Sequence, residues 1–294
     1  MHHSLLVSKY TAIKQLIHSQ IINAVSIYTY NQKNLYIGNK KIPLYKGRDN
    51  SRILYISGIA LQVSKSHNQQ PMEVANAISS YLSKTCSSVF SIQIVPPGWI
   101  HLELSPPFVA AWLESLAMGS LREGGNTKEQ KSREESLISN VQIHNPARLF
   151  AIQYAHARCC SLVLLAHREE LIKLKEPLPD TSPAFWSVIF PERIPWLKCD
   201  AKLCLNHPEE SRLITELVQV VDDLECNDIG SWEKAGLNLS QAWENFWCKC
   251  GIWGEVKTSS PDLAQARLGL LMATQSVLRF LLVEKLGVLA QMEL

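Results

Sequence analysis

Between Met118 and Asn145 the chain turns polar, and this stretch divides it into two parts with different patterns. The stretch contains Gly124-Gly125, balanced charges and no aromatic residue. This composition is typical of a linker and cannot build a core. A chain of 294 residues is long enough for about two domains. We therefore predict an N-terminal domain over residues 1–118, a linker over residues 119–145 and a C-terminal domain over residues 146–294.

The first part alternates helix and strand patterns, which predicts an α+β domain. Residues 89–95 and 99–104 alternate apolar and polar positions, as two strands joined by Pro96-Pro97-Gly98 would do. Ser105 followed by Pro106 is typical of a helix start. Helices are further expected at residues 4–25, 51–66, 70–84 and 106–118, and short strands at residues 34–38 and 41–45.

The second part repeats apolar residues every three or four positions, which predicts an all-α bundle. The expected helices cover residues 148–174, 208–224, 236–250 and 260–286. In the first of them, helical geometry places His156 on the apolar face and turns Tyr154 and Arg158 together toward another face. Trp243 and Trp247, four residues apart, fit the bundle core.

Charge is unevenly distributed along the chain. Residues 1–118 hold ten Lys or Arg against four Asp or Glu, so the second part is mildly acidic although the whole chain is at +2. A basic first half favours a polyanionic partner, but it also fits an ordinary solvated face. The start of the chain does not resemble a secretory leader, the apolar run 268–283 is short for a membrane span, and eight cysteines suit a reducing compartment, so we expect a cytoplasmic protein without a membrane segment.

Several segments resemble arginyl-tRNA synthetases, in the order in which those enzymes carry them. AIQYAHARCCSLV (151–163) is similar to the start of their helical anticodon-binding domain, the DALR family, and further similar pieces lie at residues 207–221, 239–252 and 266–288 and at Met292. PPGWIHLELSPPFVAAWLESL (96–116) and residues 58–78 resemble their N-terminal additional domain. The resemblance implies a tRNA partner and an arginine-specific tRNA as the first candidate.

The synthetases carry a nucleotide-binding catalytic domain between these two parts, and here only the polar stretch lies between them. No histidine is followed two residues later by glycine, no Lys-Met-Ser-Lys run occurs, and no glycine directly precedes a lysine. The chain therefore lacks the phosphate-binding elements that ATP activation needs. We predict no enzyme activity, no cofactor and no metal.

The candidate RNA contacts combine aromatic residues that can stack on bases with cations that can bind phosphates. In the first part, the outward side chains of the second strand are Trp99, His101 and Glu103, and His101 departs from the family's asparagine. The candidates are Trp99, His101, Lys40, Lys41, Lys46, Arg48, Arg52, Tyr154, Arg158 and Met292. Without RNA binding, Trp99 and His101 would belong to an ordinary exposed strand face. Tyr154 and Arg158 would then serve packing within the bundle.

Three alternatives stay open. Cys199, Cys204 and His207, with Cys226, Cys248 and Cys250, could in principle ligate zinc, although their spacing is irregular. The aromatic segment 182–199 could dock a partner or pack over the bundle. The helical bundle could also be a protein-interaction scaffold that no longer binds RNA, which the acidic second half favours.

Overall fold

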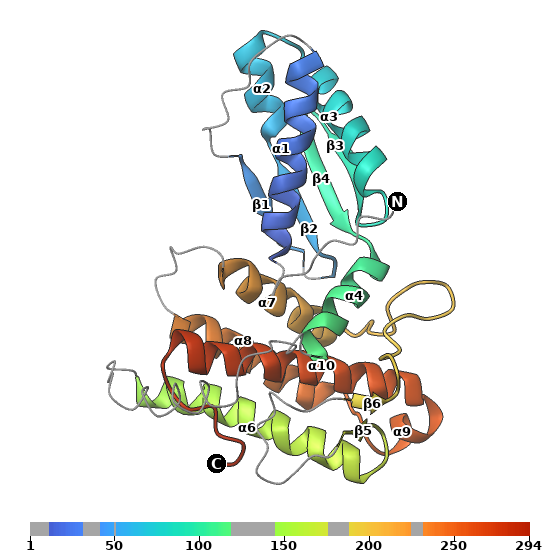
Figure 1. Ribbon diagram of the computed structural model, residues 1–294, viewed down its shortest axis with the longest axis vertical. Coiled ribbons are helices and arrows are strands. Elements are labelled where there is room, and N and C mark those ends of the chain that lie inside the picture. The colour runs from blue at the N-terminus through green and yellow to red at the C-terminus, as the bar shows by residue number, and fades with distance from the viewer. Residues whose placement is uncertain (1–11, 32–41, 50, 119–144, 176–187, 225–231) are drawn as a thin grey trace. The chain divides into compact units, whose positions relative to one another are not determined.

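Figure 1 shows a computed structural model of the chain, which describes residues 12–31, 42–49, 51–118, 145–175, 188–224 and 232–294. These residues form two compact units. The N-terminal unit comprises residues 11–109, and the C-terminal unit includes residues 110–294. The predicted linker lies almost wholly outside the described residues, as does the strand expected at residues 34–38.

The N-terminal unit is built on a four-stranded antiparallel sheet with the strand order β1-β2-β4-β3. Among the described residues of this unit, the helices lie on one face of the sheet and none lies on the other face (Figure 1). The predicted turn at residues 96–98 joins β3 to β4. The elements are α1 (Ile13–Asn31), β1 (Leu44–Lys46), β2 (Leu54–Ser57), α2 (Ile59–His67), α3 (Pro71–Cys86), β3 (Phe90–Val95) and β4 (Trp99–Leu104).

The helix expected over residues 51–66 is wrong in its first half, where the chain forms strand β2. Tyr55 and Ile56 are an aromatic and a β-branched residue, which fit a pleated surface, and β2 pairs with β1 on one side and β4 on the other. This pairing outweighs the local helical spacing. The change to helix comes at Ser57, whose hydroxyl accepts the Ile59 N–H at 3.3 Å.

The core of the N-terminal unit lies between the helices and the inner face of the sheet. Tyr55, Ile100 and Leu102 are fully buried there. The apolar and polar alternation predicted for β4 is confirmed, because its residues are alternately half-buried and buried from Trp99 to Leu104. Ser105 begins helix α4 (Pro106–Ala117), as predicted, and its hydroxyl accepts the Phe108 N–H at 3.3 Å.

The C-terminal unit is mostly helical. Helix α6 packs against α8 and α10, and α7 packs against α8. The expectation of a purely α domain needs one correction, because a small antiparallel pair of strands also forms. The elements are α6 (Pro146–Arg168), β5 (Lys173–Leu174), β6 (Val188–Phe190), α7 (Pro208–Leu224), α8 (Trp232–Lys249), α9 (Glu255–Ser259) and α10 (Pro261–Phe280), which continues as a π-helical turn at Leu281–Lys285.

A buried ion pair joins α7 to α10 inside the C-terminal unit. Arg267 Nε donates to Glu210 Oε1 at 2.6 Å, and the guanidinium also donates to the carbonyl oxygen of Gly251 at 2.6 Å. Glu210 is completely buried, and its second oxygen accepts the His207 N–H at 2.7 Å, which caps the start of α7. Both carboxylate oxygens are thus satisfied by donors.

Two helices of the described part are long and apolar enough to cross a membrane by length and composition. They are residues 146–168 and 261–285, so the second helix is longer than the apolar run 268–283 suggests. Half of the most apolar window of the first and 78% of that of the second are buried within the protein. Core helices of globular proteins have the same properties, so this is weak support for a membrane span.

Candidate nucleic-acid interface

The outer face of the N-terminal sheet carries polar and aromatic side chains in register. In antiparallel strands, directly paired residues lie on the same face. Gln93 pairs with His101, His101 with Ile56, and Ile56 with Tyr45, so these four residues form a row across all four strands. Tyr45 is 60% exposed. We name this surface, with Trp99, the sheet platform.

Trp99 lies beside this row and contacts Gly58, which follows the end of strand β2. A Cβ atom on Gly58 would come within 2.8 Å of the indole ring, so the absence of a side chain lets the ring lie close to the backbone. The ring stays half-buried and does not enter the core. Trp99 and Tyr45 can therefore offer aromatic surface to a stacked base.

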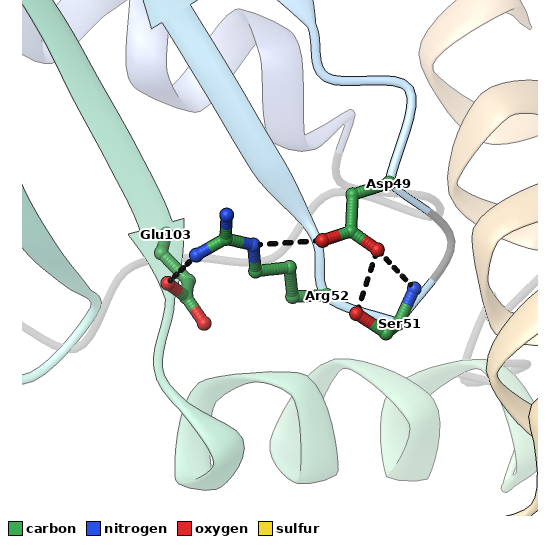
Figure 2. Close-up of polar contacts among 4 residues, drawn as sticks. All are labelled: Asp49, Ser51, Arg52 and Glu103. Carbon is green, nitrogen blue, oxygen red and sulfur yellow. Dashed lines mark hydrogen bonds and ion pairs between the residues drawn. The ribbon is translucent and has the colours of Figure 1, made fainter.

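Arg52 is held at the edge of the platform by two carboxylates (Figure 2). Its Nε lies 3.0 Å from Asp49 Oδ2, and one terminal nitrogen lies 3.3 Å from Glu103 Oε2. Asp49 also accepts the hydroxyl and N–H of Ser51, and these hydrogen bonds are the main reason that the pKa of Asp49 is lowered. Arg52 thus neutralises the Glu103 charge beside His101, and its own charge is already partnered.

The remaining basic candidates of the first part are only partly placed. Lys40 and Lys41 lie outside the described residues. Lys46 is half-buried at the end of β1, and Arg48 is exposed in the turn that follows. The structure therefore brings Arg48, Lys46 and Arg52 to the end of the sheet between β1 and β2.

A second candidate surface runs along α6 in the C-terminal unit. Phe150, Tyr154 and Arg158 are spaced four residues apart and share one face, with Phe150 and Tyr154 58% and 50% exposed. The rings of Phe150 and Tyr154 stack with centroids 6.2 Å apart. Helix α6 contains no Asp or Glu, so no acidic side chain of this helix offsets its arginines.

Two tryptophans extend this surface. The Arg158 guanidinium lies 5.8 Å from the ring centroid of Trp247, and Trp247 meets Trp253 edge to face at 5.8 Å. The expectation that Trp247 belongs to the core is therefore wrong, whereas Trp243 is buried as expected. We name the set Phe150, Tyr154, Arg158, Trp247 and Trp253 the α6 stripe.

His156 is fully buried on the opposite side of α6, as its position in the pattern predicts. Its Nδ1 lies 2.9 Å from the carbonyl oxygen of Gln291, and its Nε2 lies 3.0 Å from Gln275 Nε2. Burial lowers the pKa of His156 to about 4, so the ring is neutral near pH 7. Met292 directly follows the residue that this histidine holds.

The cysteines offer no metal centre in the described part of the chain, where no group of three or more His, Cys, Asp or Glu side chains could hold an ion. Cys250 Sγ lies 3.4 Å from His207 Nδ1, but Cys199 and Cys248 are exposed elsewhere on the surface. Burial raises the pKa of the Cys250 thiol to about 11, which disfavours a thiolate ligand. Cys226 lies outside the described residues.

The aromatic segment 182–199 is described from residue 188 onward. Trp196 and Ile194 are buried against α10, where a Cβ on Gly269 would come within 2.7 Å of the indole. Trp196 Nε1 donates to Glu114 Oε2 at 2.6 Å. This end of the segment packs on the unit, whereas Ile189 and Phe190 are exposed.

The N-terminal unit matches a known protein family. Residues 11–104 match the family described as the arginyl tRNA synthetase N terminal domain. The N-terminal unit is therefore similar to the N-terminal domain of the arginyl-tRNA synthetases. The arginine–tRNA ligases of two strains of Dehalococcoides mccartyi are each 25% identical over 81 residues, which is 26% of this chain and 14% of each relative. The chain thus matches only a small part of these ligases.

The family match to the synthetases contains the whole sheet platform and ends before the C-terminal unit. The anticodon-binding resemblance of residues 146–294 stays a prediction. Sequence reasoning missed Tyr45 and Gln93 of the platform and Phe150 and Trp253 of the α6 stripe. Phe150 could have been found, because it lies exactly one four-residue step before Tyr154 on the same helix face.

Proposed function

We propose that this protein is a non-catalytic relative of arginyl-tRNA synthetase that binds tRNA in the cytoplasm, as a regulator or chaperone. The observation that carries the proposal is the sheet platform, which presents Trp99 and the exposed Tyr45 on one sheet face inside the segment that matches the synthetase domain. Aromatic surface and nearby cations are what single-stranded RNA loops need for recognition.

The α6 stripe supplies a second RNA contact in this proposal. It presents stacked aromatic rings and Arg158 on a helix without acidic residues. An arginine beside aromatic rings can stack on a base or bind a phosphate. The C-terminal unit is then a DALR-type anticodon-binding domain, and the platform binds another part of the same tRNA.

The proposal is tested by filter binding of the purified, nuclease-treated protein to total tRNA and to arginine-specific tRNA across a salt series. We expect a preference for the arginine-specific tRNA and a linear fall of log affinity with log salt, with a slope of about −0.7 to −0.9 for each phosphate contact. Absence of binding at low salt would overturn the RNA proposal and leave the scaffold role, for which exposed Ile189 and Phe190 are the first residues to test.

Trp99→Ala is expected to weaken tRNA binding about fivefold to a hundredfold, because one base–aromatic stack contributes about 1 to 3 kcal/mol. The salt slope should stay unchanged, since no cation is lost. Tyr30→Ala is the control, because Tyr30 is an exposed aromatic residue of the same unit but lies on α1. Equal affinities of Trp99→Ala and the unmodified protein would exclude the platform.

Arg158→Ala is expected to weaken binding to all tRNAs and to reduce the magnitude of the salt slope by about 0.7 to 0.9 if the guanidinium contacts a phosphate. Lys202→Ala removes an exposed cation that is paired with Asp200 in the same unit, and it should change neither quantity. An Arg158→Ala protein with unchanged affinity and slope would remove the α6 stripe from the proposed interface.

A further inference from the structure

Strand β3 forms one edge of the N-terminal sheet. It pairs with β4 on one side, and no other strand among the described residues pairs with it. The Val89 carbonyl oxygen accepts the Ser105 N–H at 2.9 Å, so Val89 directs its backbone groups toward β4. Because this direction alternates along a strand, Phe90, Ile92 and Ile94 direct their N–H and C=O groups away from the sheet.

This edge lacks the features that keep sheet edges from pairing with another chain. Natural edge strands are commonly short or carry lysine or proline. The opposite edge follows this rule, because β1 has three residues and includes Lys46. Strand β3 has six residues without a charge or a proline, and Ile92 and Ile94 stay half-buried although they share the inner face with β4 core residues. The β3 edge thus combines apolar side chains with outward backbone groups.

Helix α3 covers β3 from the inner face of the sheet. A Cβ atom on Gly98 would come within 3.0 Å of Pro71, so α3 begins over the turn between β3 and β4. The helix contacts both of these strands and ends at Cys86, shortly before β3 begins. In the described part of the chain, α3 therefore lies over the hairpin and leaves the plane of the sheet open beside β3.

Residues 89–95 read the same in chemical type from either end. The matched pairs are Val89 with Val95, Phe90 with Ile94, and Ser91 with Gln93, and Ile92 is the central residue. Two antiparallel copies with a two-fold axis at Ile92 would place each residue opposite one of its own type. Aromatic and β-branched pairs on one face and polar pairs on the other stabilise such strands. An unrelated partner strand would not require this symmetry.

We propose that β3 pairs with β3 of a second copy of this chain, antiparallel about a two-fold axis at Ile92. The axis brings no like charges together, because β3 carries none. Ile92 directs its backbone groups outward, so the two central residues exchange two hydrogen bonds. The two sheets then form one continuous sheet with both outer faces on the same side. This inference does not depend on the proposed function.

Sedimentation equilibrium of the full chain over a wide range of protein concentration tests the pairing. We expect a mass twice that of one chain at the upper concentrations. The double variant Ser91→Lys with Gln93→Lys places lysine opposite lysine in both polar pairs, which should raise the dissociation constant of the dimer at least about a hundredfold. Both side chains are exposed, so the fold should persist, and circular dichroism checks this.

The matched control is Ser91→Lys with Gln93→Glu. It changes the same two positions but places lysine opposite glutamate, so it should dimerise at least as tightly as the unmodified protein. Equal dissociation constants for the two double variants would overturn the proposed register. A mass of one chain for the unmodified protein at every concentration would overturn the inference, whether or not tRNA binds.

Amide hydrogen exchange gives a second measurement. In the dimer, the N–H groups of Phe90, Ile92 and Ile94 should be protected, and this protection should be lost in Ser91→Lys with Gln93→Lys. The N–H groups at positions 91 and 93 point toward β4 and should stay protected in both proteins. A dimer in which Phe90, Ile92 and Ile94 exchange freely would exclude β3 from its interface.

Discussion

Replacing Arg267 by methionine is expected to lower the free energy of unfolding of the protein by about 3 to 5 kcal/mol, because it leaves a buried carboxylate without its cation. Glu210 is completely buried, and the Arg267 guanidinium is its only ion-pair partner among the described residues. Urea unfolding followed by tryptophan fluorescence measures the loss. The same arginine also donates to the carbonyl of Gly251, which adds to the cost.

Lys202→Met is the control for this prediction. Lys202 and Asp200 form an ion pair in the same unit, but the lysine side chain is 77% exposed, so its loss should cost less than about 1 kcal/mol. Adding Glu210→Gln to Arg267→Met removes the buried charge and should recover part of the stability. Equal losses for Arg267→Met and Lys202→Met would contradict the assignment of a buried ion pair.

Acid is expected to destabilise the protein through His156. The pKa of the buried ring is about 4, against an ordinary value of 6.5, so the unfolded chain binds more protons than the folded chain between these two values. The full contribution is present above about pH 6.5 and is lost as the pH falls toward 4. At about 1.36 kcal/mol for each pKa unit, the loss amounts to about 3 kcal/mol.

Urea unfolding at several pH values between 7 and 4 measures this loss. His156→Asn cannot titrate, so its stability should fall much less over the same range. Other carboxylates with lowered pKa values, such as Asp49, Asp200 and Glu209, lose their contribution at more acidic pH in both proteins, so the difference between the two curves isolates His156. Parallel curves would show that the histidine is not buried in its neutral form.

Local sequence patterns were sufficient to predict the bounds of helices that have one apolar face and clear start and stop residues. The predicted bounds of α7 agree with the structure, and α3 begins at Pro71, one residue after the expected start. The same reasoning failed for β2, because its helical spacing is local whereas its two partner strands are distant in sequence. It also misplaced Trp247, since a step of four residues turns about 40° around a helix and moves a side chain from the core to its edge.

The candidate sites show the same limit. The outward direction of Trp99 and the shared face of Tyr154 and Arg158 follow from strand and helix periods alone. Two features depend on contacts across long stretches of chain: the partnering of Arg52 by Glu103, and the contact of His156 with Gln291. No residue pattern within either local segment indicates its distant partner.

The sheet platform depends on Gly58, a buried residue that a ligand on the platform would not touch. It is buried, and any side chain there would start 2.8 Å from the Trp99 ring. Since the ring has no room to sink, it would tilt outward and lose its orientation for stacking. The position of the Trp99 ring therefore depends on the buried Gly58. Substitutions of this buried residue should impair the platform as substitutions of its exposed residues would.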